Sequence, residues 1–304
     1  MESSPSLPVS SEQQSNDRTG KEFGEKKMPS HAREIGHAQR FQFGRNWARF
    51  LRLLNEQRIH NAQASLSTIL EMENLKGKSF LDAGSGSGLS SLAAARLGAA
   101  RIHSFDFDPQ SVACTRELKR RYFPEFADWT IEEGNVMDSS YLDACGQFDI
   151  VYSWGVLHHT GQMWKALDSV IPSVAPSGRL FIAIYNDQGV ASRFWGKVKS
   201  IYVKGWLGRA FIVSIFVPYF VLRGLAADLL QLKNPLSRYR RYSEVRGMSV
   251  VRDWIDWLGG YPFEYAKPEE IFDFYQKRGF SLIKLATCGG SMGNNQFVFL
   301  KTGK

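Results

Sequence analysis

The residues Phe80-Leu81-Asp82-Ala83-Gly84-Ser85-Gly86-Ser87-Gly88 decide how the rest of the chain is interpreted. An apolar run that predicts a buried strand is followed by a turn of glycine and serine, and the alanine-rich run 89–97 then predicts a helix. Because glycine lacks a Cβ, a ligand can approach the backbone of such a turn, where the free N–H groups of the helix's first turn also point. The stretch therefore predicts a ligand-binding loop between a strand and a helix.

The spacing of the glycines distinguishes two classes of cofactor. A dinucleotide-binding loop has the pattern G-x-G-x-x-G, but Leu89 stands where its third glycine belongs. The pattern here, an acid two residues before three alternating glycines, resembles the first motif of the class I S-adenosylmethionine (SAM)-dependent methyltransferases. This resemblance implies SAM as the cofactor, with the carboxylate of Asp82 binding its amino group directly or through water. The loop residues that it implies in cofactor binding are Gly84, Ser85, Gly86 and Gly88.

The second predicted strand, residues 101–106, ends in an acid. Asp106 lies about twenty residues past the glycines, the distance at which a strand–helix–strand unit delivers a carboxylate to a ribose diol. Two hydroxyls need two acceptor oxygens, and this side chain has them. Phe107 is expected to cover one face of the adenine. Asp108 precedes Pro109 and is expected to cap the next helix.

The third predicted strand, residues 129–133, leads into Gly134-Asn135-Val136-Met137-Asp138. This segment resembles the third cofactor motif of the same family, which implies that the side chain of Asn135 and the backbone N–H of Val136 recognise the adenine edge. The family more often has aspartate at the position of Asn135. An amide oxygen can still accept a proton from the adenine amino group, so the expected contact is preserved.

The fourth predicted strand and its exit run from Phe148 to His159. In open parallel sheets the ligand lies beyond the carboxyl ends of the strands, so Ser153 and Trp154 are expected at the cofactor pocket. The segment resembles the corresponding part of bacterial methylases of the ubiquinone-biosynthesis type, which are benzoquinol methylase-like enzymes. That resemblance implies a small acceptor molecule.

Candidate catalytic residues follow the fourth and fifth strands. A histidine with a pKa near neutrality could remove a proton from a hydroxyl or amine. The adjacent side chains of His158 and His159 cannot both point to the pocket, so one of them is expected in this role, and we favour His159. The alternative is that these histidines cap a helix or bind the backbone. Tyr185 is a further catalytic candidate and Asn186 a substrate-lining one, at the end of strand 179–184. No set of ligands with metal-binding spacing is evident, so no metal is expected.

Length and composition limit the other classes of protein. The 304 residues are 43% apolar, which is enough for a large core and an insertion, and the three cysteines show no pairing pattern. A reducing cytoplasm is therefore the expected compartment. Residues 1–28 are rich in Ser, Gln, Glu and Pro and lack the apolar centre of a signal peptide, so we expect a disordered tail.

The resemblance also implies the fold class. We expect an α/β protein with a Rossmann-like, seven-stranded methyltransferase sheet whose last strand is antiparallel, because strands 280–287 and 295–301 are joined by a short glycine-rich turn. Residues 77–187 form the SAM-binding core, and residues 263–304 complete the sheet with a helix and two strands. Residues 29–76 form an N-terminal helical cap. The cap residues that could line the substrate site are Phe43, Asn46 and Trp47.

Residues 188–262 are expected to form a helical insertion after the fifth strand. Between residues 191 and 250 eleven Lys or Arg side chains stand against two acids, which accounts for the net charge of +8. The apolar run Phe211–Leu222 is too short to span a bilayer. We favour a lid or homodimer contact with a buried apolar face. An interfacial helix at the inner face of a membrane is the second interpretation, and a transmembrane helix is the least favoured.

Together these patterns favour a SAM-dependent methyltransferase that acts on a small molecule, which could be lipophilic, by in-line transfer to oxygen, sulfur or nitrogen. An RNA-modifying or nucleic-acid-binding protein that uses the basic insertion is a less favoured alternative. A dinucleotide-dependent oxidoreductase is disfavoured by Leu89 and by the terminal strand pair. A protein that binds SAM without catalysis also remains open.

Overall fold

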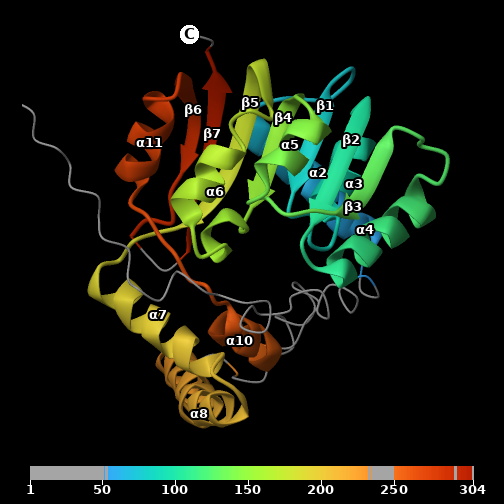
Figure 1. The fold of residues 1–304 in the computed structure, drawn as a ribbon. Helices are drawn as coiled ribbons and strands as arrows, with labels where there is room; N and C mark the ends of the chain where they lie inside the picture. The colour runs from blue at the N-terminus through green and yellow to red at the C-terminus, as the bar shows by residue number, and fades with distance from the viewer. Residues whose placement is uncertain (1–50, 52–53, 232–233, 235–249, 291–292, 303–304) are drawn as a thin grey trace, which may run out of the picture. The chain divides into compact units, whose positions relative to one another are not determined.

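The computed structural model describes residues 51, 54–231, 234, 250–290 and 293–302 (Figure 1). Their centre is a seven-stranded sheet in the order β3-β2-β1-β4-β5-β7-β6. The strands are β1 Ser79–Ala83, β2 Arg101–Asp106, β3 Trp129–Glu133, β4 Phe148–Trp154, β5 Val174–Tyr185, β6 Phe280–Ala286 and β7 Asn294–Lys301. The first five pair in parallel, and β7 runs antiparallel to both β5 and β6. The predicted fold class, with its reversed last strand, is confirmed.

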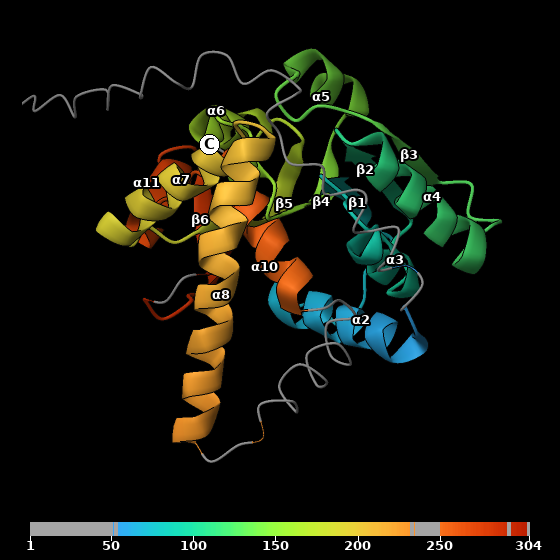
Figure 2. The ribbon, with the colours of Figure 1, turned by 90° about the horizontal axis from the view of Figure 1, so that it is seen from below.

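Helices cover both faces of the sheet, and the alternation of side chains along the strands explains why. Phe80 points to one face and Leu81 to the other, and both are completely buried. The face of Phe80 is covered by α2 (Glu56–Leu70), α3 (Leu89–Arg96) and α4 (Pro109–Tyr122). The face of Leu81 is covered by α5 (Ser139–Cys145), α6 (Met163–Ser169) and α11 (Pro268–Gln276). Figure 2 shows the two groups of helices on opposite sides of the strands.

A local signal placed the start of α4 correctly. The side chain of Asp108 accepts a hydrogen bond of 2.9 Å from the N–H of Gln110, with Pro109 as the first residue of α4, so the predicted N-cap is confirmed. α2 lies within residues 29–76, where the N-terminal helical cap was expected. The predicted tail and the candidate residues Phe43, Asn46 and Trp47 lie outside the described residues.

The insertion consists of α7 (Val190–Tyr202), α8 (Trp206–Leu230) and α10 (Val250–Gly259), which share a small core around Val198, Tyr202, Ile212 and Leu258. The apolar segment is longer than the sequence suggested, because α8 has 25 residues and continues through Pro218. Judged by length and composition alone, α8 is long and apolar enough to cross a membrane. Within the described residues, α7 and α10 cover only part of its apolar surface, and burial of the remainder in a homodimer stays a prediction. The buried residues of α8 are Ile212 and the acid Asp228.

Candidate functional site

The glycine loop between β1 and α3 lies at the carboxyl edge of the parallel strands. Gly84, Gly86 and Gly88 all have positive φ angles, which glycine adopts without strain. A Cβ at Gly88 would come within 2.8 Å of the backbone of Thr115, and one at Gly84 within 2.3 Å of the Val156 side chain. Two of the three glycines are therefore required by packing inside the protein. Gly84 and Gly86 nevertheless remain partly exposed, as a ligand-binding loop requires.

Asp106 binds directly to this loop. Its Oδ2 accepts a hydrogen bond of 2.9 Å from the N–H of Gly86, and its Oδ1 accepts one of the same length from the N–H of Asp108. Burial raises the pKa of this carboxyl to about 6, although the backbone hydrogen bonds from Asp108 and Gly86 oppose the shift. Each carboxylate oxygen can accept a second hydrogen bond, so the pair can still receive two hydroxyls. Phe107, 37% exposed, follows at the same edge.

Asp82 points into the protein. Its side chain is 2% exposed, and its Oδ2 accepts a hydrogen bond of 2.5 Å from the hydroxyl of Ser91 in the first turn of α3. Ser91 in turn contacts Ser104 at 2.8 Å, which accepts a hydrogen bond from the indole of Trp129. Burial raises the pKa of Asp82 to about 7 against the effect of Ser91. Its contact with a cofactor stays a prediction. Because the side chain is buried, contact through a water molecule fits better than direct contact.

Two other predicted cofactor residues also direct their side chains inward. The hydroxyl of Ser85 lies 3.0 Å from that of Thr115, and the hydroxyl of Ser153 donates a bond of 2.9 Å to the carbonyl of Ala83. These contacts fix the loop to α4 and β4 to the end of β1. Trp154, the next residue after Ser153, is 51% exposed at the strand end.

The third motif adjoins the second strand as predicted. The N–H of Gly134 donates a bond of 3.0 Å to the carbonyl of Asp106. Asn135 uses its side-chain oxygen to accept a bond of 3.0 Å from the N–H of Met137, which shapes the turn. Val136 is buried, so its backbone is the part that can face a ligand. The roles of Asn135 and Val136 in adenine recognition stay predictions.

The candidate catalytic residues form one cluster. The ring centroids of His158 and Tyr185 are 4.1 Å apart, and those of His159 and Tyr185 are 5.5 Å apart. His158 is completely buried, and burial, together with the nearby His159, lowers its pKa well below its usual value. This side chain is therefore neutral and is not a base that a substrate can reach. Asn186 is turned to β7, where its side-chain oxygen accepts a bond of 3.0 Å from Asn295.

His159 is half-buried and has a defined orientation. Its Nδ1 lies 2.6 Å from the carbonyl of Pro262, so Nδ1 carries the proton and Nε2 carries the lone pair. Burial lowers the pKa of His159 to about 4. At neutral pH the ring is consequently an uncharged hydrogen-bond acceptor. Phe263, whose centroid lies 5.0 Å from that of Tyr185, extends the cluster.

Sequence reasoning missed Lys199, which lies beside this cluster. It is completely buried, and its ammonium donates a hydrogen bond to the carbonyl of Trp257 and lies 4.3 Å and 4.9 Å from the ring centroids of Trp257 and Phe263. Burial lowers its pKa to about 7, and no acidic side chain pairs with it among the described residues. The signal was present in the sequence, since Trp195, Val198, Lys199 and Tyr202 recur at the spacing of one helix face.

Glu264 is a second residue that the sequence did not single out. Both of its side-chain oxygens lie 3.0 Å from the N–H of Met163, at the start of α6, and its own N–H donates a bond of 3.0 Å to the carbonyl of His158. Burial raises the pKa of this carboxyl to about 7. Glu264 thereby fixes the segment that follows α10 to the exit of β4.

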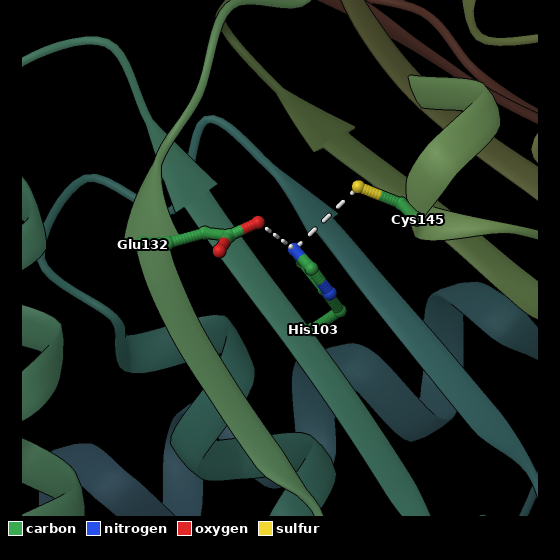
Figure 3. A group of neighbouring side chains, drawn as sticks. All are labelled: His103, Glu132 and Cys145. Atoms are coloured by element: carbon green, nitrogen blue, oxygen red, sulfur yellow. Dashed lines mark hydrogen bonds and ion pairs between the residues drawn. The ribbon is translucent and has the colours of Figure 1, made fainter. Parts of the chain in front are cut away.

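One group of side chains in the described part of the chain could hold a metal ion: His103, Glu132 and Cys145 (Figure 3). Nε2 of His103 lies 3.1 Å from Oε1 of Glu132 and 3.6 Å from Sγ of Cys145. The Tyr141 hydroxyl already donates a bond of 2.8 Å to Glu132 and lies 3.2 Å from His103. The group therefore forms a hydrogen-bonded network that fixes α5 to β2 and β3, and it does not belong to the glycine loop.

Comparison with known proteins agrees with this geometry. Residues 81–180 match the protein family described as "Methyltransferase domain". A ribosomal protein L11 methyltransferase of Methylococcus capsulatus is 50% identical over 52 residues, which cover 17% of this chain and 18% of that protein. The corresponding protein of Burkholderia mallei is 31% identical over 140 residues, 44% of this chain and 39% of that protein. The chain thus spans well under half the length of these relatives.

Two examples show that solved structures share the fold. An O-methyltransferase family protein from Burkholderia thailandensis superposes with a TM-score of 0.50 at 11% identity, over 81% of this chain and 57% of that one. PKMT2 from Rickettsia typhi, solved in complex with AdoHcy, superposes with a TM-score of 0.51 at 10% identity, over 78% and 52%. Residues 81–180 thus match a methyltransferase domain, and the two superpositions show the same fold. The relatives named here are L11 methyltransferases, and the ubiquinone-biosynthesis subfamily stays a prediction.

Proposed function

We propose that this protein is a SAM-dependent methyltransferase that acts on a small, lipophilic acceptor. The observation that carries the proposal is the carboxylate of Asp106, held by the amides of Gly86 and Asp108 beside a partly exposed glycine loop, within the matched domain. An oxidoreductase is disfavoured because β7 is antiparallel to its neighbours, unlike the last strand of a dinucleotide-binding sheet.

The residues at the carboxyl edge fit SAM. Asp106 offers two oxygens to the ribose hydroxyls, Phe107 offers an exposed ring to the adenine, and the turn at Asn135 borders the same strand end. When bound, SAM supplies a methyl group that its sulfonium already activates. The protein's task is then to hold the acceptor in line with the bond that breaks, which is catalysis by positioning.

The acceptor side is aromatic, which supports a lipophilic acceptor. Trp154, His159, Tyr185, Phe263 and Tyr265 are all partly exposed around the ends of β4 and β5. Because His159 is neutral at pH 7, it can accept a hydrogen bond from an acceptor hydroxyl and so orient it, although its lowered pKa makes it a weak base.

Calorimetry with S-adenosylhomocysteine tests the cofactor site. Asp106→Ala removes both oxygens of the carboxylate that is expected to bind the ribose, so we expect the affinity for S-adenosylhomocysteine to fall by at least roughly 100-fold. Asp108→Ala is the matched control, because it removes a neighbouring carboxylate, which caps α4, and keeps the backbone N–H that binds Asp106. An affinity for the Asp106 variant equal to that of the control would contradict the proposal, as would absence of binding to the unmodified protein.

A methyl-transfer assay tests the acceptor class. Labelled SAM is offered with quinols, phenols, thiols and amines, and separately with ribosomal protein L11 and with RNA. Methylation of a small lipophilic compound is expected. Transfer only to the protein or only to RNA would overturn the proposed acceptor but keep the proposed reaction. No transfer to any of them, with SAM bound, would leave a protein that binds SAM without catalysis.

We further propose a cytoplasmic location at the inner face of a membrane. The three cysteines are free, which supports a reducing compartment. The basic, apolar insertion supports contact with a membrane surface. Fractionation of cells that express the full chain tests this location, and recovery in an oxidising compartment would contradict it.

A further inference from the structure

The helix α8 exposes a long apolar stripe. Six large side chains on it, each between 46% and 77% exposed, are Trp206, Leu207, Phe211, Ile215, Tyr219 and Leu222. From Leu207 onward they recur every three or four residues, so they lie along one side of the helix. A helix of 25 residues is about 37 Å long. Soluble proteins rarely leave so extended an apolar surface uncovered.

The opposite side of α8 is fixed to the rest of the insertion. The ring of Phe216 lies 5.2 Å from that of Trp195 on α7, and the ring of Phe220 lies 5.3 Å from that of Trp254 on α10. In Figure 2 the C-terminal part of α8 runs clear of the other labelled helices. Because protein covers one side of the helix, lipid cannot surround it as it surrounds a transmembrane helix. The other side is left free to meet a partner.

The exposed charges of α7, α8 and the turn between them have one sign. The cations Arg193, Lys197, Lys204, Arg209 and Arg223 are exposed, while Asp228, the single acid between residues 190 and 230, is 3% exposed. A two-fold contact with a second copy of the chain would bring these like charges close together. Anionic headgroups beside an apolar layer match both the charges and the stripe.

We propose that α8 docks the protein on anionic membranes, with its exposed stripe in the acyl boundary and the neighbouring cations at the headgroups. The helix lies in the plane of the interface. The insertion that carries α8 adjoins the acceptor site at both of its ends, since α7 begins shortly after Tyr185 and α10 ends shortly before Pro262, whose carbonyl lies 2.6 Å from Nδ1 of His159. Docking would thus hold the protein at the membrane in which a lipophilic acceptor dissolves, an extension that rests on the proposed function.

Flotation of the full chain with vesicles tests the docking, without SAM, so that its failure is distinct from failure of methyl transfer. We expect binding to vesicles of phosphatidylcholine and phosphatidylglycerol, little binding to phosphatidylcholine alone, and release by salt. Phe211→Ser with Leu222→Ser should weaken binding at least roughly thirty-fold. Leu285→Ser on β6, 42% exposed, is the matched control for loss of an exposed apolar side chain.

The charge contribution has its own variants. Lys204→Gln with Arg209→Gln should weaken binding to anionic vesicles about tenfold or more, whereas Lys165→Gln with Lys277→Gln, which removes two exposed lysines elsewhere, should not. All changed side chains are exposed, so the variants should fold, which circular dichroism checks. Failure of the unmodified protein to bind anionic vesicles overturns the proposal. So does light scattering that shows a dimer lost in the Phe211/Leu222 variant, because a second copy would then cover the stripe.

Discussion

Replacement of Lys199 by methionine tests the most unusual group in the insertion. The free energy of unfolding of the unmodified protein should rise with pH above about 7, because the folded state loses the lysine proton there, while the unfolded chain keeps it until about pH 10.5. Lys199→Met has no proton to lose. The difference in free energy of unfolding, variant minus unmodified protein, should therefore fall by about 1.4 kcal/mol per pH unit between pH 8 and 10.

The size of the effect at pH 7 follows from the same group. A lysine whose pKa is lowered from 10.5 to about 7 destabilises the folded protein by about 5 kcal/mol. The variant loses the hydrogen bond to the Trp257 carbonyl, at a cost of about 1 kcal/mol, and that carbonyl keeps the N–H of Gly260 at 3.4 Å. We therefore expect Lys199→Met to be more stable by about 4 kcal/mol at pH 7.

Denaturant unfolding at a series of pH values measures this difference. Lys197→Met, two residues earlier on α7 and exposed, is the matched control for loss of a lysine from the same helix. A flat difference for Lys199→Met, or a variant less stable than the unmodified protein at pH 7, would refute the reasoning. Either result would mean that the buried ammonium has a compensating anion.

Three further predictions concern the core and the site. Gly88→Ala should lower the free energy of unfolding by at least about 2 kcal/mol, because its Cβ would meet the Thr115 backbone. Gly77→Ala, which has a similar φ and open space around the Cβ, should lower it by about 1 kcal/mol, and denaturant unfolding compares the two variants. Asp82→Asn should gain stability relative to the unmodified protein as pH rises from 5 to 7, since the raised pKa of Asp82 makes its ionisation costly in the folded state; a constant difference across that range would contradict this. His159→Ala should slow methyl transfer by about 100-fold and keep S-adenosylhomocysteine affinity within about threefold, measured by kinetics and calorimetry; equal losses would place His159 with the cofactor.

The sequence by itself determined the elements whose signals are local. The strand–glycine loop–helix unit, the end of β2 at Asp106, the cap at Asp108 and the terminal strand pair all follow from short-range patterns. Each depends on backbone conformation or on spacing within one or two elements, which neighbouring residues impose. For the same reason the position of the candidate site at the carboxyl edge was predictable.

Only the tertiary structure decided where individual side chains point and which surfaces stay open. Ser153 was expected at the pocket but donates to Ala83, and the network of His103, Glu132 and Cys145 joins residues far apart in sequence. The burial of Lys199 and the exposure of α8 depend equally on which helices pack together. Packing between distant segments sets these outcomes, and helical periodicity marks a face without specifying whether protein, lipid or water covers it.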